Sequence, residues 1–302
     1  MKRKVNRVGM NTLTVSLPSK WIRKYGVKQG DEVEVIEKTD SITFSLGEKS
    51  KDQSLEIDMA EFDILIPRAI HSLYKEGYDK IKILLKGPED IQLVQHAMGN
   101  ETIGYEIVKQ EGDYCSIEII SEVLKEGFDD ILRRIFLTSL MQAEEGYVAI
   151  NNKDLVKLKN LRLLEETNNR LTTFCRRTLN RRHHIEENKR TFLYVIIEQL
   201  EKISDEYKYL FDYLIKNDYG VNKEIMDFYK KTGEMLRLFY ESFYAFEPKK
   251  IVKIAKLRKS MVKDFDKYLG RKNKTDEIIL HHSIVIAQEI FNLIGPLIAL
   301  KH

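Results

Sequence analysis

The sequence predicts a multidomain α+β protein with a small β-rich region, a small α/β sandwich and an all-α C-terminal domain. Short alternating apolar patterns occupy residues 1–50, strand and helix patterns alternate over 51–121, and helical periodicity fills 122–302. The formal charge changes sign with these parts. Ten basic and six acidic residues give +4 for 1–50, seven and fourteen give −7 for 51–120, and 33 and 27 give +6 for 121–302. We therefore expect three parts with different partners.

Composition indicates a soluble globular chain, and we expect a cytoplasmic location. Its 302 residues are 43% hydrophobic and 32% charged, and Cys115 and Cys175 are too few for a disulfide framework. The opening MKRKVNRVGMN has no apolar core of a signal peptide. The most apolar segment, HHSIVIAQEIFNLIGPLIAL, is interrupted by polar residues and by Gly295-Pro296, so we predict no membrane insertion.

Residues 1–50 predict the order strand, strand, short helix, strand, strand. RKVNRV and TLTVSL alternate on either side of a turn at Gly9, and DEVEVIEK and SITFSL form a second hairpin around Thr39. Pro18 opens the helix between the hairpins and Gly26 ends it. About 47 residues arranged in this way bury a poor core. We therefore expect this region to require a second copy and to be dimeric.

The first basic residues of the chain precede every acid. No Asp or Glu occurs before Asp31. A merely solvated face would normally mix both signs, so this cationic arm indicates contact with the phosphate backbone of double-stranded DNA. Arg3, Arg7 and Arg23 are the candidates for reading guanine edges, because a guanidinium can pair bidentately with guanine.

The middle part, 51–121, predicts a small α/β sandwich. Strand patterns such as DKIKILL and YCSIEII alternate with the helical patterns EFDILIPRAIHSLYKEG and PEDIQLVQHAM, and Pro67 predicts a late start or a kink in the first helix. The sequence contains no Gly-rich phosphate loop and no nucleophile elbow here. A structural or ligand-sensing spacer is the interpretation that we favour.

The C-terminal part predicts six helices in two bundles, 122–217 and 221–302. The helical patterns cover 122–148, 153–182, 186–217, 221–246, 248–271 and 275–301. The third pattern has an apolar seam at Phe192, Ile196, Leu200, Ile203, Tyr207 and Leu210. Adding 87 to these numbers gives Ile279, Ser283, Ala287, Ile290, Ile294 and Leu297, most of them apolar or small. We infer that helices 1–3 are repeated as helices 4–6.

Oxygen-bearing side chains lie beside this seam with one-turn spacing. They are Glu165, Glu166 and Asn169 on the second helix, and Glu198, Glu201 and Asp205 on the third. Clustered oxygens on facing helices can bind hard cations or iron, but a carboxylate stripe is more often a solvated face. The second copy has Gln288 and Asn292 where the first has Glu201 and Asp205. Any metal should therefore bind in the first bundle.

The N-terminal motif identifies a family resemblance. NRVGMNTLTVSLPSKWIRKYGVKQGDEVEVIE resembles the AbrB/SpoVT swapped-hairpin DNA-binding domain. The resemblance implies that two chains interleave into one AbrB-like β-barrel and form a homodimer. Its basic residues then face DNA, which here implies Lys2, Arg3, Lys4, Arg7, Lys20, Arg23 and Lys24. Met10-Asn11 replaces the small residues expected in the first loop and is expected to alter base contacts.

The helical half resembles the PhoU family of phosphate-uptake regulators, which consists of two tandem three-helix bundles. LEKISDEY, residues 200–207, is similar to the E-x-x-x-D signature of that family, and the order of the three parts looks like that of archaeal PhoU-type regulators. The resemblance implies a metal ion (iron, zinc or another divalent cation) bound by Glu165, Asn169, Glu201 and Asp205.

Two functions follow from these features, and neither is enzymatic. The first is a dimeric DNA-binding transcriptional regulator of phosphate uptake, and the second is an adaptor that negatively regulates a phosphate transporter or its sensor kinase without a physiological DNA site. The pairs His183-His184 and His281-His282 lack HExxH spacing, and we interpret them as surface or bundle-end residues. The basic stretch RRTLNRRHHIEENKR, residues 176–190, is either a solvated bundle end or a second contact with DNA or an acidic partner.

Overall fold

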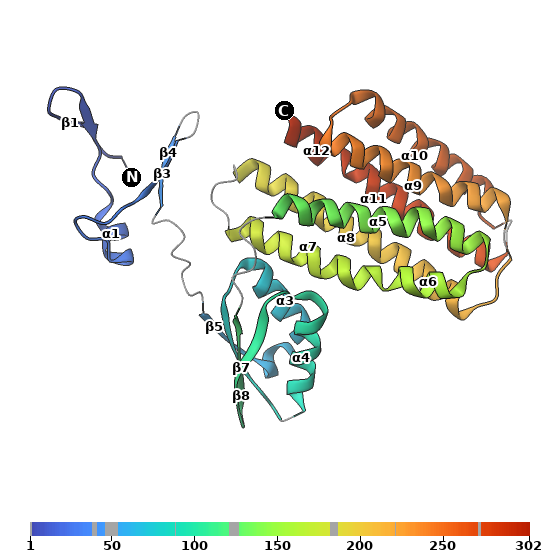
Figure 1. The fold of residues 1–302 in the computed structure, drawn as a ribbon, viewed down its shortest axis with the longest axis horizontal. Helices are drawn as coiled ribbons and strands as arrows, with labels where there is room; N and C mark the ends of the chain where they lie inside the picture. Colours follow the sequence, from blue (N-terminus) through green and yellow to red (C-terminus); the bar gives the residue numbers. More distant parts are fainter. Residues whose placement is uncertain are drawn as a thin grey trace. The chain divides into compact units, whose positions relative to one another are not determined.

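A computed structural model describes residues 2–37, 41–45, 54–87, 89–120, 127–181, 187–220, 222–270 and 273–302. It divides the chain into two compact units, Met1–Lys51 and Asp52–His302. Small hairpins at the N-terminus, one small sheet and a mostly helical C-terminal region confirm the predicted fold class (Figure 1).

The first unit contains two antiparallel hairpins and one short helix. Its elements are β1 (Asn6–Val8), β2 (Thr12–Thr14), α1 (Ser19–Tyr25), β3 (Glu34–Glu37) and β4 (Ile42–Ser45). β1 pairs only with β2 and β3 only with β4, so the described strands form two separate two-stranded sheets. Gly9 turns the first hairpin at φ 71°, and Gly26 ends α1 at φ 63°, a left-handed conformation in which glycine lacks the steric penalty of a side chain. The predicted order of elements is confirmed.

No described side chain of this first unit is buried. Large apolar side chains are instead exposed on both hairpins and on the segments beside them, namely Val5, Val8, Met10, Leu13, Val15, Val35 and Ile42. A single chain therefore forms the local elements of this unit but no hydrophobic core among its described residues.

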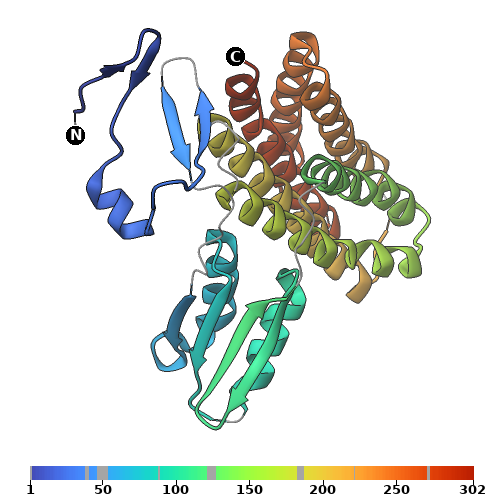
Figure 2. The ribbon, with the colours of Figure 1, turned by 60° about the vertical axis from the view of Figure 1, so that its left-hand side comes forward.

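The second unit begins with a four-stranded sheet. Its elements are β5 (Ser54–Asp58), α2 (Met59–Phe62), the 3₁₀ turn η1 (Asp63–Leu65), α3 (Ile66–Glu76), β6 (Lys80–Leu84), α4 (Asp90–Glu101), β7 (Tyr105–Glu111) and β8 (Tyr114–Ile119). The strand order is β5-β6-β8-β7, with β5 parallel to β6 and the other pairs antiparallel. α3 and α4 cover one face (Figure 2), because alternate residues such as Ile81 and Ile83 are buried there. Pro67 lies in the first turn of α3, which explains why α3 begins only at Ile66.

The remaining elements of the second unit are helices. They are α5 (Phe128–Asn151), α6 (Leu155–Arg162), α7 (Leu164–Arg181), α8 (Glu187–Lys216), α9 (Lys223–Tyr244), α10 (Pro248–Tyr268), α11 (Lys274–Asn292) and α12 (Ile294–Lys301). The six predicted helical segments are present, with the second divided at Leu163 and the sixth at Leu293.

These helices form two three-helix bundles that pack against each other. α5, α7 and α8 form the first bundle, α9, α10 and α11 form the second, and contacts of α5 with α9 and of α8 with α11 join them (Figure 1). The predicted seam is buried in both copies, for example at Leu200 and at Ala287. Gly146 allows the close packing of α5, because a Cβ atom there would lie 2.5 Å from the Tyr229 hydroxyl and 2.7 Å from the Phe211 ring.

The segment Lys274–Lys301 is long and apolar enough to cross a membrane by length and composition alone. It is divided into α11 and α12, and α11 packs against α8, α9 and α10. Core helices of helical bundles also have this composition, so the segment is weak evidence of a membrane span.

Candidate functional site

All seven residues predicted to bind DNA are exposed. Lys2, Arg3, Lys4 and Arg7 lie at or before β1, and Lys20, Arg23 and Lys24 lie on α1. The views in Figures 1 and 2 show the β1–β2 hairpin and α1 at opposite ends of the extended segment that joins them. The first unit therefore presents two separate basic groups in a single chain.

The local packing of α1 determines which way its basic residues face. Trp21 and Tyr25 contact each other with ring centroids 5.6 Å apart, and both are half-buried. Lys20, Arg23 and Lys24 have spacings of three and four residues and therefore share another face of the helix. Arg23 and Lys24 lie in its last turn, where the helix dipole favours positive charge.

Arg7 differs from the other candidates in its position on the hairpin. It is in register with Leu13, and side chains directly opposite each other on paired strands lie on the same face. Arg7 therefore shares a face of the hairpin with an exposed apolar residue. The basic residues of α1 lie on a helix and have no such partner on a paired strand.

Three of the four predicted metal ligands meet around a lysine. Lys208 Nζ on α8 donates to Glu165 Oε1 at 2.8 Å and to Asp205 Oδ1 at 3.1 Å. The Asn169 amide also donates to Glu165 Oε1, at 2.6 Å. Glu165, Lys208 and Asp205 thus form an ion-paired bridge between α7 and α8.

The fourth predicted ligand, Glu201, lies in a different group. Its Oε2 accepts a hydrogen bond from Thr172 Oγ1 at 2.7 Å and one from the Arg176 guanidinium. Arg176 is buried, so this pair is largely removed from water. In the second bundle Gln288, the counterpart of Glu201, accepts two hydrogen bonds from Arg258 on α10, at 3.0 and 2.6 Å.

This donor set, as arranged, does not fit a metal ion. The described residues contain no group of three or more His, Cys, Asp or Glu side chains disposed to hold one. Glu165 and Asp205 already share the Lys208 ammonium, and Glu201 is paired with Arg176. A divalent cation would have to compete with these ammonium and guanidinium groups for the same oxygens. Metal binding by this bundle stays a prediction.

The Asp205 carboxyl gives the first testable prediction. Burial raises its pKa to about 6, with Glu165 adding to the rise and Lys208 opposing it. The folded protein therefore binds this proton more tightly than the unfolded chain, whose value is 3.8, so the contribution of Asp205 to the free energy of unfolding falls as pH increases from about 4 to 6. Asp205→Asn cannot ionise and is expected to remove this contribution, so its pH profile should differ from the native one in this range. Thermal unfolding across this pH range measures it, with the exposed Asp227→Asn as control. A variant as pH-dependent as the native protein would refute the assignment.

Residues 176–181 of the basic stretch have a role that the sequence did not reveal, and residues 182–186 lie outside the described residues. Arg177 Nη1 donates to the backbone carbonyls of Tyr74 and Tyr78 at 2.8 and 2.7 Å, and its Nη2 donates to Asp79 Oδ1 at 2.6 Å. Arg181 also pairs with Asp79. The interpretation as a solvated bundle end is therefore wrong for Arg176 and Arg177, which are buried. This part of α7 attaches the sheet to the helices.

The interpretation of the histidine pairs also changes. His282 on α11 is half-buried, and its Nδ1 lies 2.7 Å from Glu206 Oε2 on α8, so it joins the two bundles. His281 is exposed, as predicted. The pair at 183–184 lies outside the described residues.

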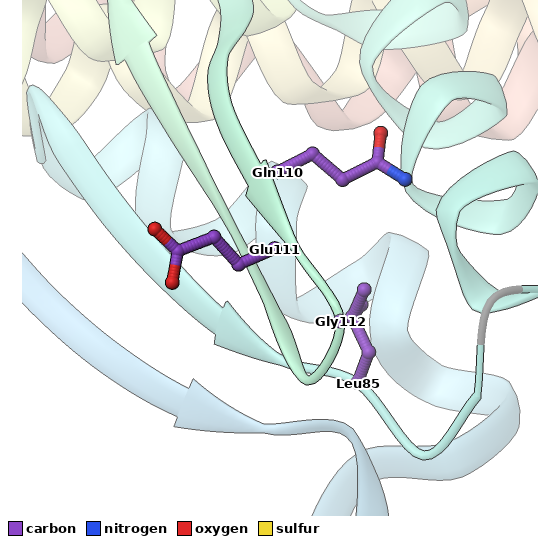
Figure 3. Close-up of a pocket in the computed structure, with 4 residues that line it drawn as sticks. All are labelled: Leu85, Gln110, Glu111 and Gly112. Carbon is purple, nitrogen blue, oxygen red and sulfur yellow. The ribbon is translucent and has the colours of Figure 1, made fainter.

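A shallow pocket lies at the end of the sheet, where Leu85, Gln110, Glu111 and Gly112 line it. Figure 3 shows that the side chains of Gln110 and Glu111 point to opposite sides of the strand. These two polar side chains therefore do not converge on the part of the pocket that the described residues line.

Comparisons with known proteins give matches for both ends of the chain. Residues 7–43 match the family model "Antidote-toxin recognition MazE, bacterial antitoxin". The helical region is similar to the crystal structure of the phosphate transport system regulatory protein PhoU from Streptococcus pneumoniae. That similarity has a TM-score of 0.49 and 13% identity, and covers 58% of this chain and 93% of the other. No curated protein gives a significant match. Neither description names a catalytic activity.

Proposed function

We propose that this protein is a dimeric DNA-binding regulator of transcription whose helical domain senses an effector or binds a partner. The single observation that carries the proposal is the first unit, which exposes all seven predicted DNA-contacting residues and contains the MazE-type match at 7–43. Its sequence resemblance to the swapped-hairpin domain supports DNA as the partner. The resemblance of the helical half to phosphate-uptake regulators supports genes of phosphate uptake as the target.

A second copy of the chain would provide the core that the first unit lacks. Its large apolar side chains are exposed in one chain, and none of its described residues is buried. Burying apolar surface is the main favourable term in association. Interleaving two chains would cover the apolar side chains of the paired strands, such as Leu13, and would present two sets of basic residues to one duplex.

Salt dependence tests the proposal directly. If four basic residues per chain contact phosphates, a dimer neutralises about eight, and the slope of log K against log salt should be about −7. Replacing Lys20, Arg23 and Lys24 by glutamine removes up to about six contacts per dimer and should make the slope shallower by up to about 5. Titration of duplex DNA at several salt concentrations measures both.

A matched control carries the same change of charge elsewhere. Lys159, Lys216 and Lys223 are exposed and make no ion pair with any described residue. Replacing these three by glutamine should leave the slope unchanged. A native protein with a flat salt slope on every duplex would refute DNA binding.

The competing function is an adaptor for a phosphate transporter or its sensor kinase. The observation that favours it is that the second unit, Asp52–His302, is compact and contains most of the chain. None of the seven residues predicted to contact DNA belongs to it. Affinity purification of the native protein distinguishes the two. Transporter or kinase subunits without promoter fragments would support the adaptor, and promoter fragments would support the regulator.

A further inference from the structure

Helix α10 is much more basic than the rest of the helical domain. Between Pro248 and Tyr268 it carries eight basic and two acidic residues, a net charge of +6. This equals the net charge of all residues from 121 to 302. The helix packs against α9 and α11 and lies at the outside of the second bundle (Figure 1).

The lysines of α10 form a single stripe. Six of them are exposed, and they are Lys249, Lys253, Lys256, Lys259, Lys263 and Lys267. At about 100° per residue they fall within an arc of about 120°, and the first and last lie about 27 Å apart along the axis. Ile254 and Met261 are buried on the other side of the helix. We call these six side chains the lysine stripe.

Most of the lysine stripe lacks acidic partners. Lys253 pairs with Glu234 on α9 at 2.6 Å. Lys249, Lys256, Lys259 and Lys263 make no ion pair with any residue that the structure describes. Like charges three and four residues apart destabilise a helix. The stripe therefore weakens α10 in isolation, and a bound polyanion would relieve the repulsion.

We propose that the lysine stripe binds the phosphate backbone of duplex DNA, independently of base sequence. The chemistry suits phosphate, because a lysine ammonium is a compact point charge without the planar fork with which arginine forms bidentate pairs. A duplex carries one negative charge per about 1.7 Å, so a row of cations about 27 Å long faces many phosphates. The inference extends the proposed function to a second surface and rests on its claim that the chain binds DNA.

Protein and lipid partners fit the stripe less well. Stable protein interfaces have a core of aromatic and other apolar anchors. Val252 is the exposed large apolar side chain of α10, whereas Ile251, Ile254 and Met261 are buried in the bundle. A helix that lies on a membrane also needs a free apolar face. The apolar face of α10 is covered by α9 and α11.

The test neutralises three of the unpaired lysines in the full-length protein. The variant carries Lys256→Gln, Lys259→Gln and Lys263→Gln, which are exposed positions with no described ion pair to break. Each α10 in contact with DNA should then make the salt slope shallower by about 3 on a duplex of arbitrary sequence. The preference among duplex sequences should not change. The variant with Lys159, Lys216 and Lys223 neutralised is the matched control and should retain the native slope.

The variant of Lys20, Arg23 and Lys24 separates this inference from the proposed function. A shallower slope for the α10 variant but not for the α1 variant supports the lysine stripe and refutes the proposed DNA contact of α1. A shallower slope for the α1 variant alone overturns the lysine stripe and leaves the proposed function standing. A further result also overturns the inference. In it the α10 variant keeps the native duplex slope but no longer binds phosphatidylglycerol vesicles or polyglutamate, which the native protein binds. The partner of the stripe would then be a membrane or an acidic protein.

Discussion

Replacing Leu13 by aspartate is expected to convert the protein to a monomer and to abolish its binding to duplex DNA. Leu13 lies on β2, and 69% of it is exposed in a single chain. If two first units interleave, this side chain becomes part of their shared core, and the long Arg7 side chain on the same face must then extend past the edge of that core to contact DNA. Each buried leucine contributes about 1.5–3 kcal/mol, and a two-fold dimer loses two of them. The dimer dissociation constant should therefore rise about 100- to 10,000-fold, even before the cost of burying a carboxylate.

Light scattering or sedimentation over a range of protein concentrations measures the dissociation of the dimer. A salt titration with duplex DNA measures the resulting loss of DNA binding. Met10→Asp is the control for association, because Met10 is 86% exposed in the turn between β1 and β2. It introduces the same charge outside the paired strands and should remain dimeric. A Leu13→Asp protein that is dimeric and keeps the native salt slope would show that the first hairpin does not form the interface.

Local signals were sufficient to predict the elements of both units. Pro18 and Gly26 determine α1 because each acts within a single turn, one through its fixed φ and the other through its left-handed conformation. Pro67 likewise determines the start of α3. The seam of α8 was predictable because apolar residues recur along it with the period of a helix. This pattern can be read from the local sequence without knowledge of contacts to distant residues.

The partners of the carboxylates were not predictable in the same way. Glu165 and Asp205 share Lys208, but the pairing depends on how α7 and α8 are rotated against each other. A signal was present, since Lys208 follows Asp205 by three residues and Glu201 by seven, on the same stripe of α8. The resemblance to PhoU proteins and the spacing of the oxygen-bearing side chains led to the prediction of a metal site, which stays a prediction. Considering cations at the same spacing would have predicted ion pairs.

The attachment of the sheet to the helices was also beyond the sequence. Arg177 and Asp79 are 98 residues apart along the chain. An arginine-rich helix end has the same local pattern whether it faces water, DNA or another part of its own chain. Only burial distinguishes these cases, and burial depends on the tertiary fold.

Arg177→Met is expected to destabilise the second unit by about 3–5 kcal/mol, because it removes a buried guanidinium that donates to two backbone carbonyls and to one carboxylate. The Arg177 side chain is 7% exposed, its guanidinium lies 4.8 Å from the centre of the Tyr74 ring, and it satisfies two backbone carbonyls as well as Asp79. Methionine replaces its packing but not its hydrogen bonds, so the carbonyls of Tyr74 and Tyr78 would lose their guanidinium donor.

Denaturant unfolding followed by circular dichroism measures the loss, and hydrogen exchange shows where it occurs. Exchange should accelerate most in β5, β6 and α3, because the sheet loses its attachment to α7 while the helical bundles keep their own core. Arg181→Met should cost less, since the Arg181 side chain is 31% exposed and Arg177 still holds Asp79. Arg134→Met, the same substitution at an exposed position of α5, should have little effect. Equal unfolding midpoints for Arg177→Met and Arg134→Met would mean that the sheet and the bundles fold independently. A conformational signal between the sheet and the bundles could then not pass through α7.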